Sequence, residues 1–262
     1  MTPIQLAFAG WLLMALMMSA LFLVQYRKKQ ADIVDVGWAF GIGVLGIIYA
    51  VAGDSHPHRR LLLAILSAGW SFRLAGYLFF NRFLDPEEDG RYAAIRRKWQ
   101  PLLQLKLFIF FQVQGVLDVI LSIPFLVVAF GMPHPLTPWA YLACAVWLTA
   151  VGGELIADRQ LAAFRSDPAN RGAVCTVGLW RYSRHPNYFF EWLHWWTYVL
   201  LAAGSSWWFL TLIAPALMLF FILKITGIPP TEERALESRG EAYRRYQRTT
   251  SSFIPWFPRR DA

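Results

Sequence analysis

A short polar loop leads straight into an aromatic, apolar run in the stretch Gly178-Leu-Trp-Arg-Tyr-Ser-Arg-His-Pro-Asn-Tyr-Phe-Phe-Glu191. Pro186 suits the first position of a helix, where its fixed φ fits and its missing N–H is not needed. A helix that begins at Pro186 would place Asn187 and Glu191, four residues apart, on one face. Polar side chains one turn inside a membrane helix are costly unless they are used. The stretch therefore predicts a membrane helix that starts at a functional polar site.

The loop before this helix is basic, and it precedes backbone N–H groups that the helix leaves free. Arg184 and His185 stand directly before Pro186, and Tyr182 lies two residues earlier. Cationic side chains beside free helix N–H groups form an anion site. We expect this loop to bind a phosphate-bearing cofactor. The alternative is a basic loop that only orients the helix in the bilayer.

The composition places the chain among membrane proteins. Of 262 residues, 56% are hydrophobic and 16% aromatic, and the mean hydropathy is +0.38. These values exceed those of an ordinary soluble domain. The net charge of +8 indicates basic loops held against anionic lipid rather than binding of nucleic acid. The two cysteines, Cys144 and Cys175, support neither a disulfide framework nor a metal site.

Seven apolar runs are long enough to cross a bilayer, which takes roughly 20 residues. They cover residues 4–24, 33–52, 61–81, 107–130, 138–157, 187–203 and 207–225. The sixth run is the least regular, because Glu191 and His194 interrupt it. We predict an all-α integral membrane protein, with about seven transmembrane helices in one membrane domain over residues 1–262. Cytoplasmic loops would cap the cofactor, and residues 226–262 would form a cytoplasmic tail.

Lysine and arginine are distributed unevenly between alternate loops. The loops after the first, third and fifth runs and the tail carry nearly all of them, whereas the other loops carry only Arg59 and Arg60. By the positive-inside rule, the N-terminus lies outside and the C-terminus in the cytoplasm. The stretch from Gly178 to Glu191 then lies at the cytoplasmic face. We expect a bacterial inner membrane rather than an endoplasmic reticulum.

An acid opens the second run, at Asp35. A carboxyl group near the start of a membrane helix either reaches back to the interface or has a function. We expect Asp35 to stay protonated in apolar surroundings and to donate a hydrogen bond. The alternative is an interfacial acid beside the positive end of the helix dipole.

Polar residues at four-residue spacing form a stripe on the third run. They are Arg73, Tyr77 and Asn81, with Arg82 next to the last. An arginine two turns inside a span needs a carboxylate or a phosphate as its partner. In the loop that follows, we expect Glu87, Glu88 and Asp89 to be solvated, whereas Arg91 and Tyr92 could contact a ligand.

A second polar stripe leaves the membrane at the end of the fifth run. Glu154, Asp158 and Arg165 keep roughly helical spacing. Carboxylates there can accept hydrogen bonds from ribose hydroxyls or an adenine amine, and Arg165 can contact phosphate. A structural network between the acids and the arginine is the alternative.

These residues together resemble a known family. Gly178-Leu179, Tyr182 and Asn187 with Glu191 are similar to the C-terminal region of the steroid 5-alpha-reductases (3-oxo-5-alpha-steroid 4-dehydrogenases) and their bacterial homologues. The resemblance extends back to Asp158 with Arg165, and then to Arg73, Tyr77, Asn81 and Arg82. Asp35 stands where the family has its carboxylate in the second span. The similarity covers about residues 33–195 and much of the tail.

The resemblance implies a seven-helix membrane oxidoreductase that reduces the 4,5 double bond of a 3-oxo-Δ4 steroid, or of a related enone lipid, with NADPH. The substrate would enter from the bilayer, and hydride would add to the enone β-carbon. The implied catalytic residues are Asp35, Trp70 and Glu191; Trp70 stands where the family has a tyrosine partner of the acid. The implied NADPH-binding residues are Arg73, Tyr77, Asn81, Arg82, Arg91, Glu154, Asp158, Arg165, Tyr182, Arg184, His185 and Asn187.

A second family shares part of the motif. The run from Arg184 to Tyr188 also resembles the Arg-His-Pro-x-Tyr motif of the isoprenylcysteine carboxyl methyltransferases, whose S-adenosylmethionine site uses a Glu-Glu-containing tail like Glu232-Glu233. The alternative function is therefore an S-adenosylmethionine-dependent membrane methyltransferase. Glu191 favours the reductase, because the methyltransferase motif tends to have small residues at that position. No Gly-x-Gly-x-x-Gly motif indicates a Rossmann domain.

Overall fold

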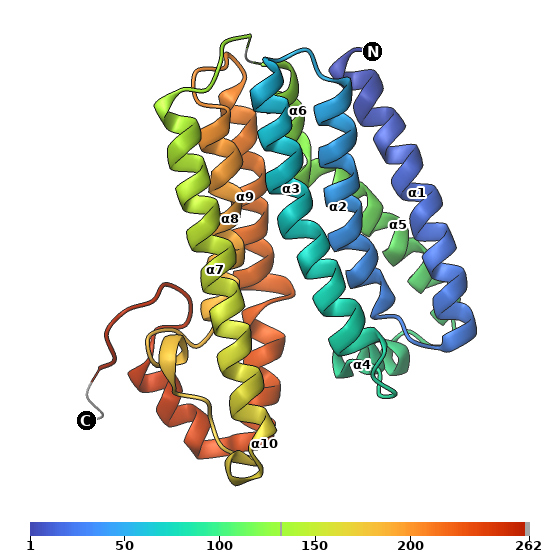
Figure 1. The fold of residues 1–262 in the computed structure, drawn as a ribbon. Helices are drawn as coiled ribbons and strands as arrows, with labels where there is room; N and C mark the ends of the chain where they lie inside the picture. Colours follow the sequence, from blue (N-terminus) through green and yellow to red (C-terminus); the bar gives the residue numbers. More distant parts are fainter. Residues whose placement is uncertain (132, 260–262) are drawn as a thin grey trace. The chain divides into compact units, whose positions relative to one another are not determined.

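The computed structural model describes residues 1–131 and 133–259, and the secondary structure in these ranges is helical (Figure 1). The α-helices are α1 Pro3–Lys28, α2 Ile33–Ala52, α3 Pro57–Leu78, α4 Gly90–Lys98, α5 Leu103–Leu121, α6 Ile123–Phe130, α7 Pro138–Ser166, α8 Pro186–Leu201, α9 Ile213–Phe220 and α10 Ile228–Thr249. The remaining elements are the π-helical turns η1 Phe79–Phe83 and η5 Phe221–Ile225, and the 3₁₀ turns η2 Pro168–Asn170, η3 Gly178–Arg181 and η4 Trp208–Leu212.

Six helical segments of the described chain are long and apolar enough to cross a membrane. The protein is therefore an all-α, multi-pass integral membrane protein, as the composition predicts. The expected number is about seven; the helix in the sixth run, α8, is not among the six because it has 16 residues. At 1.5 Å per residue it spans about 24 Å, less than the roughly 30 Å hydrocarbon core. Its predicted start at Pro186 is confirmed.

The chain divides into two compact units, which we describe separately. The first unit comprises Met1–Ala140 and Tyr198–Ala214, and the second comprises Tyr141–Thr197 and Pro215–Ala262.

Helix α2 is the centre of the first unit and packs against α1, α3 and α5. Glycine lets α3 approach it closely, since a Cβ added to Gly46 would lie 2.2 Å from the Ser67 hydroxyl oxygen. The buried aromatic core around α1, α2 and α5 includes Met18 and Phe111. This packing fixes the first turn of α2, where Asp35 lies.

A buried arginine joins two connecting segments of the first unit. The Arg59 side chain at the start of α3 is fully buried and donates to the backbone carbonyls of His134 at 3.0 Å, Pro135 at 3.1 Å and Leu201 at 2.8 Å. Carbonyl acceptors satisfy a buried guanidinium without a carboxylate. Arg59 therefore holds the loop between α6 and α7 and the end of α8.

Helix α7 is longer than its apolar run. The hydropathy pattern ends near residue 157, whereas the helix continues to Ser166. The last two turns are polar, so helix propensity and contacts rather than apolar content extend them. This extension carries Asp158 and Arg165 on a continuous helix beyond the apolar run.

Candidate functional site

A cluster of ionised and hydroxyl side chains surrounds Asp35 in the first turn of α2. The Asp35 carboxylate accepts a hydrogen bond from Arg91 Nη2 at 2.9 Å and from the Tyr92 hydroxyl at 2.5 Å. Arg82 Nη1 lies 3.8 Å from the same carboxylate. Asp35 is therefore an acceptor between two arginines and a phenol, which corrects the expectation that it donates a hydrogen bond.

Asp89 holds Arg91 in place. Its carboxylate caps α4 by accepting from the Arg91 backbone N–H at 2.9 Å, and it pairs with Arg91 Nη2 at 3.1 Å. Burial alone would raise the pKa of Asp89, but the charge and hydrogen bonds of Arg91 outweigh burial and lower that pKa to about 2. The expectation that Asp89 is only solvated is therefore wrong.

Tyr92 is almost completely buried between α4 and the start of α2. Burial and the adjacent Asp35 charge raise the pKa of Tyr92 well above that of an ordinary phenol. The phenol of Tyr92 thus stays protonated and can donate a hydrogen bond.

Glu88, also expected to be solvated, pairs instead with Arg96 Nε at 2.8 Å.

The α3 residues occupy different positions around this cluster. The fully buried Trp70 ring packs edge-on against Trp38, with centroids 6.1 Å apart. The hydroxyl group that contacts Asp35 belongs to Tyr92. Arg73 and Tyr77 are half-buried. Asn81 donates to the Tyr77 backbone carbonyl at 2.9 Å. Of the predicted set in this unit, the structure brings together Asp35, Arg82 and Arg91.

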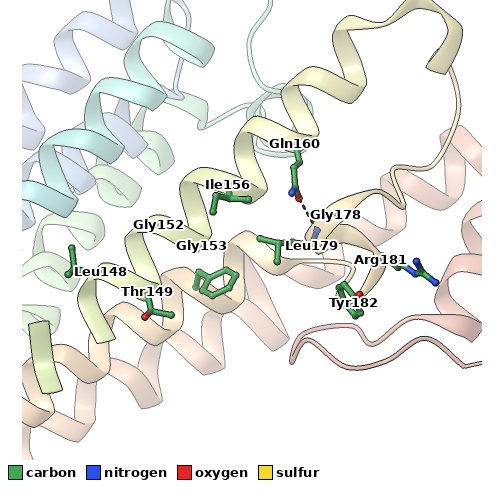
Figure 2. A pocket seen from close by; sticks show the side chains of 11 residues that line it. Leu148, Thr149, Gly152, Gly153, Ile156, Gln160, Gly178, Leu179, Arg181 and Tyr182 are labelled. Carbon is green, nitrogen blue, oxygen red and sulfur yellow. Dashed lines mark hydrogen bonds between the residues drawn. The ribbon is translucent and has the colours of Figure 1, made fainter. Parts of the chain in front are cut away.

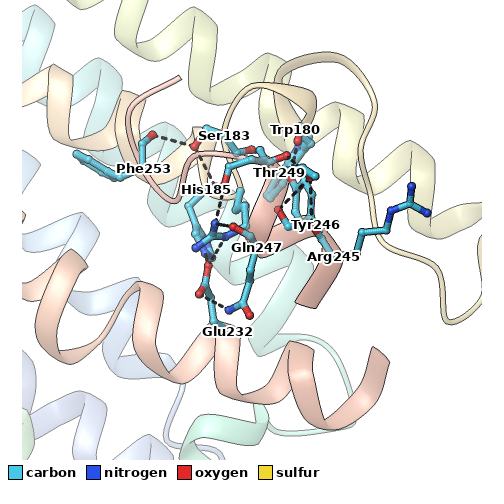
Figure 3. Close-up of polar contacts among 11 residues, drawn as sticks. Trp180, Ser183, His185, Glu232, Arg245, Tyr246, Gln247, Thr249 and Phe253 are labelled. Atoms are coloured by element: carbon cyan, nitrogen blue, oxygen red, sulfur yellow. Dashed lines mark hydrogen bonds and ion pairs between the residues drawn. The ribbon is translucent and has the colours of Figure 1, made fainter. Parts of the chain in front are cut away.

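In the second unit, the basic loop before α8 is held by an acid of α10 (Figure 3). Arg184 Nε lies 2.6 Å from Glu232 Oε1, and His185 Nε2 lies 3.2 Å from the same oxygen. Arg184 also donates to the backbone carbonyls of Gln247 at 3.0 Å and Thr250 at 2.5 Å. Both predicted cationic residues therefore contact Glu232, which supplies the anion next to them.

Backbone contacts fix the same loop from the far end of α10. The Tyr246 hydroxyl donates to the Trp180 and Ser183 carbonyls, and the Ser183 hydroxyl donates to the Phe253 carbonyl at 2.8 Å. The Trp256 N–H donates to the Tyr182 carbonyl at 2.9 Å. The segment 251–259 thus runs beside residues 182–184 and keeps the start of α8 in a defined conformation.

The α7 and α8 polar residues meet where α8 begins. Asn187 Nδ2 donates to Asp158 Oδ1 at 3.4 Å, as the two predicted stripes require. The Asn187 Oδ1 atom is buried and accepts no hydrogen bond within residues 1–131 and 133–259. Glu154 is buried, Glu191 half-buried and Arg165 exposed.

A groove of about 610 Å³ lies along α7 in the second unit (Figure 2). Leu148, Gly152 and Ile156 line its apolar part. Gln160, Arg181 and Tyr182 line its polar part. The polar part of the groove requires glycine at position 178, because the φ of Gly178 is +57° and a Cβ there would lie 2.3 Å from the Gln160 side chain. Tyr182, predicted to bind cofactor, therefore faces this groove.

Sequence reasoning missed several contacts that build the two clusters. From the sequence, Glu232 stands out only as part of a Glu-Glu tail, and Tyr92 only as a residue that could contact a ligand. Gln160 and Gln247 were not identified; Gln160 accepts from the Leu179 N–H at 2.8 Å, and Gln247 donates to Glu232 at 2.7 Å. In the described chain, no three His, Cys, Asp or Glu residues are placed as metal ligands.

Comparison with known proteins gives a family and one relative. A family model described as "Protein of unknown function (DUF1295)" matches residues 21–250. An uncharacterized protein of Schizosaccharomyces pombe, C594.04c, is 26% identical over 279 residues, which cover 94% of this chain and 78% of that protein. No solved structure matches the chain.

Proposed function

Since the chain belongs to the DUF1295 family, which is steroid 5-alpha-reductase-like in general, we propose that it is an NADPH-dependent reductase. Its substrate would be a 3-oxo-Δ4 steroid or a related enone lipid that arrives from the bilayer. The reaction is reduction of the 4,5 double bond. The excess of Lys and Arg in alternate loops supports a cytoplasmic position for α10 and the loop before α8, where NADPH is available.

The proposal rests mainly on the Asn187 Oδ1 atom, a buried hydrogen-bond acceptor without a donor among the described residues. The amide nitrogen of the same side chain donates to Asp158. A buried acceptor without a donor is costly, and a nicotinamide carboxamide offers the N–H that it lacks. Glu191 lies one turn further along α8, on the same face.

The other polar residues suit the rest of a dinucleotide. In the second unit, Glu154 and Asp158 could accept hydrogen bonds from ribose hydroxyls, and the exposed Arg165 could bind a phosphate. In the first unit, the polar stripe of α3 and the two arginines beside Asp35 supply donors of the same kind. The donor and acceptor types therefore fit NADPH, which when bound supplies the hydride.

Asp35 and Tyr92 would act on the substrate ketone. Negative charge grows on the ketone oxygen as the β-carbon accepts hydride, and a donor already in place stabilises that charge. The protonated Tyr92 phenol has one O–H to donate. In this structure it is donated to Asp35 at 2.5 Å, and it would turn to the ketone oxygen when substrate binds. We assign Tyr92, rather than Trp70, to the position of the tyrosine that the resembling family uses.

One contact favours a second candidate function. Glu232 contacts Arg184 and His185. The resemblance to the membrane methyltransferases rests on the same combination of basic loop and acidic tail. A methyltransferase would bind S-adenosylmethionine there. The Asn187 acceptor and the Asp35 cluster have no assigned role in that reaction, so we rank it second.

Ligand-induced thermal stabilisation of the detergent-purified protein separates the two functions. A ligand at 100 times its Kd stabilises the native state by about 2.7 kcal/mol. We expect NADPH to raise the unfolding midpoint and S-adenosylmethionine to leave it unchanged. Asn187→Ala should lose the NADPH shift, whereas Asn170→Ala, a control whose amide bonds a backbone carbonyl, should keep it. Stabilisation by S-adenosylmethionine alone would contradict the proposal.

A further inference from the structure

The groove on α7 lies on the opposite face of that helix from the proposed cofactor residues. Gly152 lines the groove, and Glu154 is two residues further along, about 200° around an α-helix. The same separation relates Ile156 in the groove to Asp158. The α7 wall of the groove is therefore on a different face from Glu154 and Asp158, while Tyr182 lines its opposite, polar part.

One part of the groove faces hydrocarbon. Leu148 and Ile156 are 65% and 50% exposed on a helix that is long and apolar enough to span the membrane. Gly152 lies between them, and a Cβ added there would meet nothing within 4 Å. From Leu148 to Ile156 the helix rises about 12 Å. This length of apolar wall suits an acyl chain rather than a compact polar ligand.

The other part of the groove lies at the membrane interface and is cationic. Trp256 and Phe257 are 70% and 75% exposed, and Phe257 packs edge-on against Tyr182. Exposed aromatic side chains of this kind sit at the headgroup level. Arg181 is exposed, and within the described ranges its side chain forms no ion pair or hydrogen bond. It can therefore pair with a lipid phosphate at that level.

We propose that this groove binds one anionic phospholipid, with its phosphate on Arg181 and an acyl chain lying over Gly152. The apolar wall provides affinity, and Arg181 provides the preference for a negative headgroup. The lipid would brace η3 against α7, where Gln160 already bonds Leu179. This role does not depend on which reaction the protein catalyses.

Native mass spectrometry of the delipidated protein, titrated with phosphatidylglycerol or phosphatidylcholine, tests the proposal. We expect one phosphatidylglycerol to bind about fivefold more tightly than phosphatidylcholine, the factor that one arginine near an anionic headgroup contributes. Arg181→Gln should remove this preference. Gly152→Leu should weaken binding of both lipids by about tenfold, equivalent to roughly two methylene groups left unburied.

Two matched variants control for the substitutions themselves. Gly76 is another helical glycine whose added Cβ would meet nothing within 4 Å, and Arg97 is another exposed arginine. Gly76→Leu and Arg97→Gln should bind both lipids as wild type does. Leucine favours helix over glycine, so Gly152→Leu keeps the fold.

Three results would overturn the proposal. Wild-type lipid affinity in Gly152→Leu would show that the groove is not the lipid site. Displacement of phosphatidylglycerol by excess inorganic phosphate would make Arg181 a free-phosphate site instead. Displacement by progesterone, a 3-oxo-Δ4 steroid, would assign the groove to the substrate.

Discussion

Arg91 on α4 donates to the Asp35 carboxylate on α2 at 2.9 Å, across 56 residues of sequence. This ion pair anchors a short polar helix on the first turn of a membrane helix. It also positions Tyr92, the next residue, so that its hydroxyl reaches the other carboxylate oxygen. Asp35, Arg91 and Tyr92 therefore form one unit, and its members can be tested separately.

Removing the Tyr92 hydroxyl should slow the proposed reduction and leave the fold intact. Tyr92→Phe keeps the buried ring but deletes the donor to a developing oxyanion, which costs about 10²–10³ in kcat at comparable sites. The measurement is steroid product formed per minute with saturating NADPH. Tyr26→Phe, at a 51% exposed tyrosine, should retain wild-type kcat. A wild-type kcat for Tyr92→Phe would remove this residue from the mechanism.

Glu191→Gln should abolish turnover while the protein remains folded. The substitution keeps the size of the side chain and removes a half-buried carboxyl group on the face of α8 that also carries Asn187. Product analysis by mass spectrometry gives turnover, and the thermal midpoint in detergent reports folding. Glu237→Gln, an exposed control on α10, should behave as wild type. Full activity in Glu191→Gln would contradict the site assignment.

Low pH should lower the stability of the first unit by protonating Asp89. Its pKa is about 2 in the folded protein, against an ordinary value of 3.8. Because the folded pKa is the lower one, the Asp89–Arg91 pair stabilises the fold above about pH 4. This contribution, about 2 kcal/mol, is lost as the pH falls towards 2.

A comparison of thermal midpoints tests the predicted loss of stability as the pH falls. Asp89→Asn should be less stable than wild type at neutral pH, and the difference should shrink between pH 4 and pH 2. Asp54→Asn, at an exposed aspartate, should follow the wild-type curve throughout. A constant gap between wild type and Asp89→Asn at every pH would rule out the ion pair as the cause.

Asp118 on α5 should be a site where an apolar residue stabilises the protein. Its side chain is fully buried, and neither carboxylate oxygen has a hydrogen-bond partner in the described chain. Asp118→Val should raise stability by about 1–3 kcal/mol, because it removes a buried polar group that has no partner. Asp118→Asn, whose amide is equally unpartnered, should stay near wild type. A lower midpoint for Asp118→Val would indicate that the acid has a role of its own.

The sequence predicts the membrane helices better than the polar helices. The bounds of α2 agree with the apolar run 33–52, since burial of a continuous apolar segment is what the pattern measures. Helix α4 does not follow from the apolar pattern because it is polar, and the extension of α7 to Arg165 follows only from the helical spacing of its polar residues. The start of α8 at Pro186 was predicted correctly, because proline at the first position is a local signal.

The candidate site could be predicted only where its contacts lie along one helix. The stripes on α3 and α7 follow from helical spacing, and the contact of Asn187 with Asp158 joins two residues that were both identified. Glu232 lies 48 residues from Arg184, and Tyr92 lies 57 residues from Asp35. Which acid pairs with which arginine depends on tertiary packing, and no local pattern encodes that choice.

The Ser183 hydroxyl bonds the carbonyl of Phe253, a residue made 70 positions later in the chain. At about 5–20 residues per second, a ribosome needs roughly 4–14 s to reach it. Arg184 lacks Glu232 for the first part of that interval, because Glu232 is made 48 residues after it. The loop before α8 can therefore take its final conformation only after segment 251–259 has been made.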